Sequence, residues 1–178
     1  MPDAFIDVGE LARRKLVFDA RFADDALDLP HDWKVIDKLS ATGEAELMGS
    51  KGVSPIRVRG RLNGQVANHC GRCLEPVEQK LDGGFELLFY PMSLIAQSEE
   101  TTISRDETEA GFYEEPGMKL VDVVREQVLL WLPMSALCKA DCQGVCTQCG
   151  VNRNRETCNC RETETASPWD ALKNFKIH

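Results

Sequence analysis

The chain of 178 residues has no long hydrophobic run and no excess of positive charge. No stretch reaches the roughly 18 consecutive apolar residues of a membrane-spanning helix. The opening MPDAFIDVGELARRK has neither the basic start nor the apolar centre of a signal peptide. With 21 Lys and Arg against 29 Asp and Glu, the formal net charge of −8 excludes a uniformly basic nucleic-acid-binding protein. We therefore expect a cytoplasmic protein with no membrane partner.

Histidine is also scarce, and no catalytic constellation is recognisable. The three histidines, His31, His69 and His178, lie far apart in the sequence. General acid-base catalysis needs a positioned histidine or carboxylate pair, and the acidic run at 99–115 is loop-like, which makes a preorganised metal pair there improbable. We therefore expect no enzymatic activity and no small-molecule substrate, with an RNA-processing enzyme as the alternative.

The charges that are present are unevenly distributed. Residues 51–80 contain 6 basic and 2 acidic side chains. Residues 92–117 contain one Arg and seven acidic side chains, and they lack apolar periodicity. The sequence thus predicts a basic strand region followed by an acidic loop over 92–117.

Residues 1–137 are predicted to form a β-rich domain. LVFDARF at 16–22 alternates apolar and polar residues, which is typical of a strand with one buried face. Further strands are expected over 42–48, 55–69 and 77–90. A helix is expected over 119–132, ending at Pro133 and closing the sheet. The predicted fold class is α+β, with an antiparallel β-meander or barrel-like sheet.

Six of the eight cysteines fall between residues 138 and 160. In a reducing compartment they are better explained by metal binding than by disulfides. The pairs Cys146-x-x-Cys149 and Cys158-x-Cys160 have spacings suited to one tetrahedral Zn²⁺ site. Residues 138–178 are therefore predicted to be a zinc-binding tail that ends in a short helix capped by Ser167.

Cys70, Cys73, Cys138 and Cys142 could form a second zinc site. The partition is ambiguous, because Cys138 and Cys142 also have helical spacing with Cys146. Four thiolates leave no position for a catalytic water, so zinc would be structural. Three alternatives remain: a dithiol redox pair at Cys70 and Cys73, His69 as a ligand, or a zinc switch that opens on oxidation.

Arg57, Arg59 and Arg61 alternate with apolar residues, so a strand would place all three on one face. With Arg72 and Lys80 nearby in sequence, they are candidate RNA-binding residues that would contact phosphates. The alternative is that they pair with carboxylates on neighbouring strands. The candidate carboxylates are Glu44, Glu46 and Glu78.

Three segments carry a resemblance: CGRCLEPV at 70–77, LPM at 132–134 and LCKADCQGVCTQCGVNRNRETCNC at 137–160. The chain resembles the large ribosomal RNA subunit accumulation protein family (YceD-like), whose paired and tail cysteines match all eight cysteines here. The resemblance implies a bacterial ribosome biogenesis factor needed for normal 23S rRNA levels. The expected partners are precursor ribosomal RNA, a basic ribosomal protein of the large subunit, or both.

Overall fold

The computed structural model describes residues 4–23, 26–30, 32–49, 54–93 and 110–160. Its main sheet has five strands in the order β2-β3-β4-β5-β6. These strands are β2 (Leu16–Phe22), β3 (Lys34–Leu47), β4 (Ile56–His69), β5 (Pro76–Pro91) and β6 (Gly111–Tyr113). Strands β2 to β5 form an antiparallel meander, and β6 runs parallel to β5. The predicted meander is therefore present, with a parallel strand added at one edge.

A small antiparallel sheet and two helices complete the described structure. Strand β1 (Phe5–Asp7) pairs with β7 (Gly117–Lys119). Helix α1 (Val8–Leu11) is capped by the Asp7 carboxylate, which accepts a hydrogen bond from the Glu10 N–H at 2.8 Å. Helix α3 (Leu120–Trp131) begins directly after β7, within one residue of each end of the predicted helix over 119–132.

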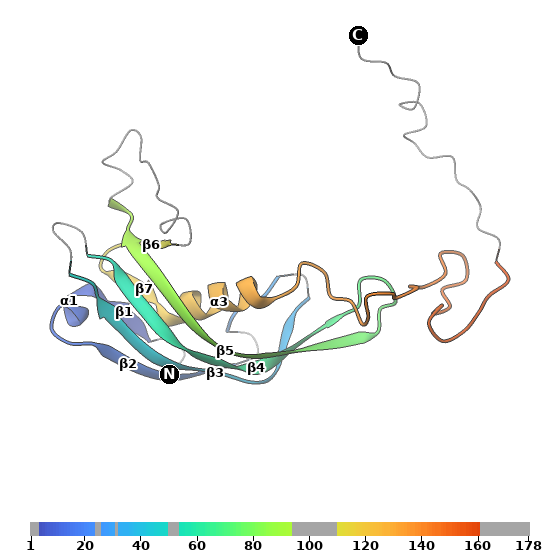
Figure 1. Ribbon diagram of the computed structural model, residues 1–178, viewed down its shortest axis with the longest axis horizontal. Helices are drawn as coiled ribbons and strands as arrows, with labels where there is room; N and C mark the ends of the chain where they lie inside the picture. The colour runs from blue at the N-terminus through green and yellow to red at the C-terminus, as the bar shows by residue number, and fades with distance from the viewer. Residues whose placement is uncertain (1–3, 24–25, 31, 50–53, 94–109, 161–178) are drawn as a thin grey trace, which may run out of the picture.

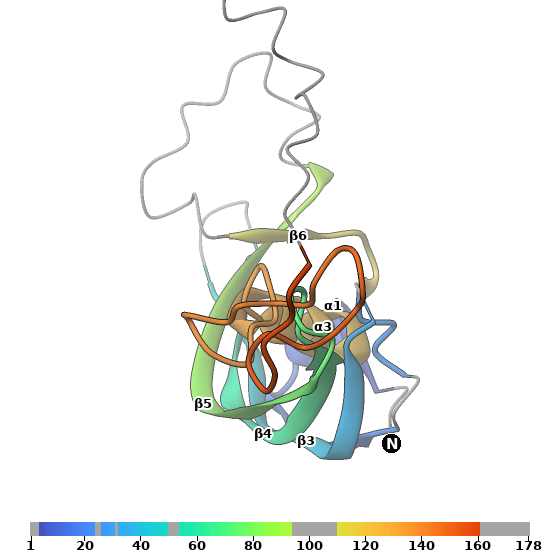
Figure 2. The ribbon, with the colours of Figure 1, turned by 90° about the vertical axis from the view of Figure 1, so that its right-hand side faces the viewer.

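The sheet bends strongly around α3, which lies along its concave side (Figures 1 and 2). The sheet is open, with β2 and β6 as its two edges, so the prediction of a barrel-like sheet is wrong. The physical reason is that α3 buries Leu120, Val124 and Val128 against the concave face. The apolar side of the sheet is thereby covered without closure onto itself.

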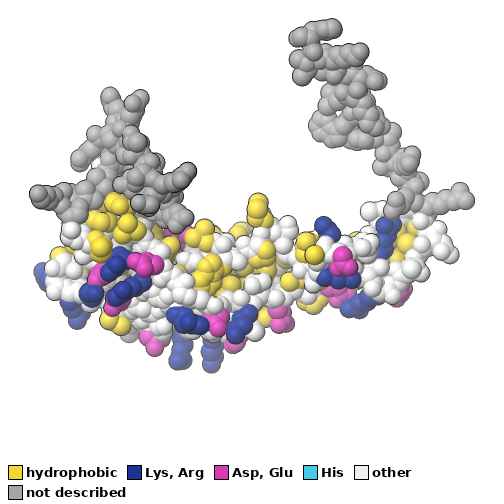
Figure 3. Space-filling model, in the orientation of Figure 1, with side chains coloured by type: hydrophobic (Ala, Val, Ile, Leu, Met, Phe, Trp, Pro, Cys, Tyr) yellow, Lys and Arg dark blue, Asp and Glu magenta, His cyan; other side chains and the backbone are white. Residues whose placement is uncertain are grey.

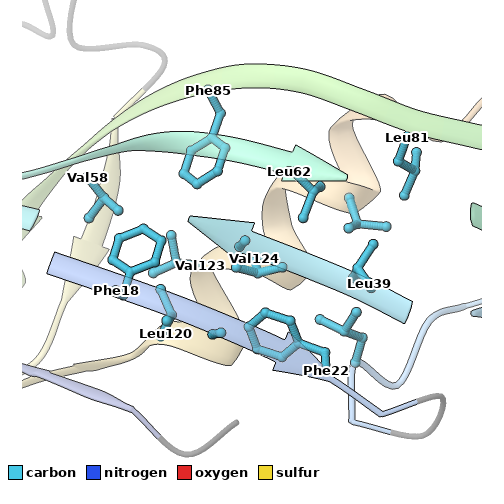
Figure 4. Packing of buried hydrophobic residues seen from close by; sticks show 14 of the residues in the cluster. Phe18, Phe22, Leu39, Val58, Leu62, Leu81, Phe85, Leu120, Val123 and Val124 are labelled. Atoms are coloured by element: carbon cyan, nitrogen blue, oxygen red, sulfur yellow. The ribbon is translucent and has the colours of Figure 1, made fainter. Parts of the chain in front are cut away.

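The core lies between the concave face and α3, and Figure 4 shows Phe18, Phe85 and Val124 within it. Gly43 of β3 and Gly60 of β4 lie opposite each other in the sheet. A Cβ atom on Gly60 would lie 2.4 Å from the Thr42 carbonyl oxygen and 3.1 Å from the Phe85 ring. Glycine is therefore required where the neighbouring strand and the Phe85 ring approach the backbone this closely.

Several predicted features are not tested by the described residues. Residues 94–109 of the acidic loop and the helix capped by Ser167 lie outside them. The division into a domain over 1–137 and a tail over 138–178 stays a prediction. Among the residues that are described, none of the helices has the length and apolar character to cross a membrane.

Candidate metal centres

The first cysteine cluster joins the tip of the β4–β5 hairpin to the segment that follows α3. Cys70 and Cys73 lie in the hairpin turn, where the Leu74 N–H donates to the Cys70 carbonyl at 2.9 Å. Cys138 and Cys142 face them from the later segment. The Sγ atoms of Cys70 and Cys142 are 3.8 Å apart, and those of Cys73 and Cys138 are 3.5 Å apart. All four Sγ atoms lie within 4.8 Å of one another.

The second cluster comprises Cys146, Cys149, Cys158 and Cys160, whose Sγ atoms also lie within 4.8 Å of one another. Gly150 has a φ of +75° and donates its N–H to the Cys146 carbonyl at 2.8 Å, which closes the turn between the first two thiols. Three thiols of the first cluster are buried, whereas only Cys146 is buried in the second. The second cluster is therefore the more accessible to solvent.

The sulfur geometry fits zinc. A regular tetrahedron with Zn–S bonds of about 2.3 Å has S···S edges of about 3.8 Å, close to the two distances in the first cluster. The membership of the clusters matches the two-site partition suggested by the spacings, and His69 belongs to neither. Four thiols per site would fill a tetrahedral shell and leave no position for a reacting water.

Local interactions shift the pKa values of the thiols in opposite directions within each cluster. Burial raises the pKa of Cys70, but backbone N–H groups around it outweigh burial and lower the pKa to about 6. Backbone N–H groups of its own turn likewise lower the pKa of Cys146 to about 6. Interactions with neighbouring thiols raise the pKa of Cys138 and of Cys160 to about 12. Without a cation, each cluster thus resists carrying several negative charges at once.

The loop of the second cluster also contacts the first. Asn154, between Cys149 and Cys158 in sequence, donates from Nδ2 to the Sγ atom of Cys142 at 3.3 Å. Its Oδ1 atom accepts the Gln143 N–H at 3.0 Å. Sequence reasoning missed Asn154, although the polar run between the two cysteine pairs was the available signal.

The predicted arginine row lies on the convex face of the sheet, where each member pairs with a carboxylate. Arg57 Nε donates to Glu46 and Arg59 Nε to Glu44, both at 2.8 Å. These are directly opposed residues in the β3–β4 register. Figure 3 shows basic and acidic side chains interspersed along this face. The ion pairs with Glu44 and Glu46, which the sequence offered as the alternative to RNA binding, are thus present.

The other three candidate RNA-binding residues do not all extend this row. Arg61 donates to Asp82 at 2.7 Å, and Lys80 lies 3.6 Å from the same carboxylate. Glu78, the third candidate carboxylate, forms no ion pair with these residues in the described part of the chain. Arg72 instead lies at the first cysteine cluster, where it donates to the Cys142 carbonyl at 3.1 Å. The structure therefore separates Arg72 from the convex face.

Residues 58–176, more than half of the chain, match the model of the family described as large ribosomal RNA subunit accumulation protein YceD. The chain belongs to this family. The region matched to the YceD family contains both cysteine clusters and Asn154. Both candidate metal centres therefore lie in the part of the chain that matches the family.

Among the relatives, an uncharacterized protein of Mycobacterium tuberculosis is 35% identical over 97 residues, which cover 54% of this chain and 44% of the relative. The YCED homolog 1 of Zea mays, named as chloroplastic, is 25% identical over 172 residues, covering 80% of this chain and 59% of the relative. The chain thus spans less than half of the mycobacterial relative's length. No solved structure matches it.

Proposed function

We propose that this YceD family member is a zinc-stabilised, non-enzymatic ribosome biogenesis factor. It supports accumulation of 23S rRNA in the cytoplasm by binding a basic protein of the large ribosomal subunit. The family description supports the process, since it names large ribosomal RNA accumulation. The thiol geometry supports zinc, and the charge distribution supports the partner.

Zinc would act as a cross-link in this proposal. Cys70, Cys73, Cys138 and Cys142 would hold one ion and fasten the post-helix segment to the hairpin tip. Cys146, Cys149, Cys158 and Cys160 would hold a second ion and close the following loop. The first cluster has little apolar packing, because Val77 and Leu137 are the only hydrophobic side chains of the described residues that pack against its buried thiols. Metal would therefore supply the stability that a hydrophobic core provides elsewhere.

The ion pairs of the arginine row are the observation that favours a protein over RNA as the partner. A face that binds RNA phosphates needs a surplus of positive charge, but Arg57, Arg59 and Arg61 each have a carboxylate partner. The chain carries a formal charge of −8, and each Zn(Cys)₄ centre would add a local charge of about −2. Both observations favour a positively charged protein over RNA as the direct ligand.

Exchange of all three arginines for Gln tests this choice. We expect affinity for a structured 23S rRNA fragment, and its salt dependence, to be unchanged, with a small loss of thermal stability from the broken ion pairs. A fall in the salt slope by about 2 to 3 units would instead show three phosphate contacts and establish RNA as the ligand of this face.

A matched variant, Glu44→Gln with Glu46→Gln, leaves Arg57 and Arg59 without their carboxylates. Tighter rRNA binding by this variant alone would show that the native pairs suppress RNA binding. Crosslinking in growing cells then identifies the partner directly. Recovery of a basic large-subunit protein supports the proposal, and recovery of RNA alone contradicts it.

The alternatives receive less support. The groups of potential metal ligands within the described residues are the two thiol sets, which favour structural zinc over the metal chemistry of an RNA-processing enzyme. A redox-regulated zinc switch is compatible with the exposed Cys149 thiol. Such a switch would regulate binding of the protein partner and would not be a separate function.

A further inference from the structure

The end of the molecule opposite the cysteine clusters contains an aromatic groove of about 330 Å³. It lies between β6, the β1–β7 sheet and the start of α3. Phe89 and Tyr113 form its buried part, while Phe5 and Phe112 remain 41% and 44% exposed. Figure 3 shows hydrophobic side chains gathered at this end. Exposed aromatic side chains in a concavity are typical of a binding surface for another chain.

The rim of this groove is acidic and lacks the pairing found on the convex face. Glu114, Asp122 and Glu126 line it, with Lys119 as the one basic lining residue. Asp122 and Glu126 are one helical turn apart on α3, and both are exposed. Across the described stretches of the chain, no ion pair involves these three carboxylates. Glu44 and Glu46, in contrast, are both paired.

The sequence that connects Met92 and Tyr113 is also acidic. The Met92 N–H donates to the Tyr113 carbonyl at 2.8 Å, so the chain leaves and re-enters the described structure beside the groove. The intervening residues 94–109 carry five acidic side chains and one Arg.

We infer that this groove binds a Lys- and Arg-rich peptide segment that carries an apolar anchor side chain. The anchor would pack against Phe5 and Phe112, and the flanking cations would meet the unpaired carboxylates of the rim. An RNA strand would be repelled by the same carboxylates. The inference deepens the proposed function and rests on it, since it assigns a place to the basic protein.

Two synthetic 12-residue peptides of Lys and Arg serve as probes, one with a central Leu-Phe pair and one with Ala-Ala at that place. Binding to the full zinc-loaded chain is measured by fluorescence anisotropy. We expect Asp122→Lys with Glu126→Lys to weaken the Leu-Phe peptide by about tenfold or more. We expect Phe112→Ser to abolish the preference for Leu-Phe over Ala-Ala.

The matched control is Asp19→Lys with Glu78→Lys, which makes the same charge change at exposed positions away from the groove. It should change affinity by less than about twofold, and thermal melting checks that all variants fold. If the control variant weakens peptide binding equally, the loss of affinity comes from net charge alone, and the groove is not the binding site.

Crosslinking in cells separates this inference from the proposed function. If the basic ribosomal protein still crosslinks to the Asp122→Lys, Glu126→Lys variant as it does to the native chain, the groove is not its binding site. The proposed function would then still hold. If the native chain crosslinks only to RNA, the proposed function is wrong whatever the peptides show.

Discussion

Single Cys→Ser replacements test whether the two clusters bind separate zinc ions and what each ion does for the fold. Cys142→Ser leaves three thiols in the first cluster, and Cys149→Ser leaves three in the second. We expect two zinc ions in the native chain and one in either variant, because a three-thiol site binds zinc much more weakly. The double variant should contain none.

The two losses should differ in their effect on unfolding. In the first cluster, Cys73 and Cys138 are 65 positions apart and enclose β5, β6, β7 and α3. Cross-linking a loop of this length reduces the entropy of the unfolded chain by an amount worth about 4 kcal/mol. In the second cluster, Cys149 and Cys158 are nine positions apart, worth about 2.5 kcal/mol, and enclose none of the sheet.

Zinc content is measured by mass spectrometry after dialysis, and urea unfolding by tryptophan fluorescence. Trp33 is 6% exposed in the core and reports on the sheet. Cys142→Ser should lower the free energy of unfolding of the sheet by about 4 kcal/mol, whereas Cys149→Ser should leave it nearly unchanged. Ser135→Ala, an exposed change in the same segment, is the control. Equal shifts in both cysteine variants, or loss of the same ion from both, would show that the two clusters do not bind separate ions with separate effects on the fold.

Three further outcomes are expected. Asn154→Ala removes the hydrogen bond to Cys142 and should speed zinc release from the first cluster to a chelator several-fold while leaving two ions bound at equilibrium. Mild peroxide should release the second ion before the first, because the second cluster is more exposed, as a zinc dye would show. Hydrogen bonds from Lys15 and Arg57 lower the pKa of Glu46 to about 2. The ionised Glu46 carboxylate therefore stabilises the fold fully above about pH 4.5 and loses this effect as the pH falls toward 2. Urea unfolding should show Glu46→Gln to be less stable than the native chain near neutral pH, and the difference should disappear toward pH 2.

Strand and helix positions were predictable where the apolar period is regular. The predicted strand over 16–22 has the bounds of β2, because Phe18, Ala20 and Phe22 alternate without interruption. Strand β3 was expected to begin at residue 42 but begins at Lys34. Register shifts between Val35 and Ser40 break the alternation there, so the sequence pattern disappears although the pairing continues.

Features that depend on contacts between distant segments were not predictable. Strand β6 has three residues, too few to show a period, and pairs parallel to β5 only after residues 94–109. Arg61 pairs with Asp82 rather than Glu78, because the β4–β5 register makes Asp82 its diagonal neighbour. That register is set by the whole hairpin and cannot be read from either strand alone.

The cysteine spacings indicated which cysteines could bind metal. They did not decide which four cysteines belong to each site. Cys138, Cys142 and Cys146 are each four residues apart, which is compatible with one helical face. The structure contains no helix there. The Gly71 N–H instead donates to the Ala136 carbonyl at 2.9 Å, and this contact aligns the segment with the hairpin turn. Chain direction after Pro133, rather than thiol spacing, therefore decides which cysteines meet.

The two ends of the molecule depend on different sources of stability. The groove is built on Phe89, Tyr113 and Val123, which belong to the main hydrophobic core. The first cysteine cluster lies apart from that core, at the tip of the β4–β5 hairpin (Figure 1), and the second cluster follows it in the chain. Loss of the second zinc should therefore leave peptide binding at the groove intact, because no groove residue lies in the loop that this ion closes. A chain that keeps the groove but fails to support 23S rRNA accumulation after that loss would show that the second metal centre makes a contact of its own.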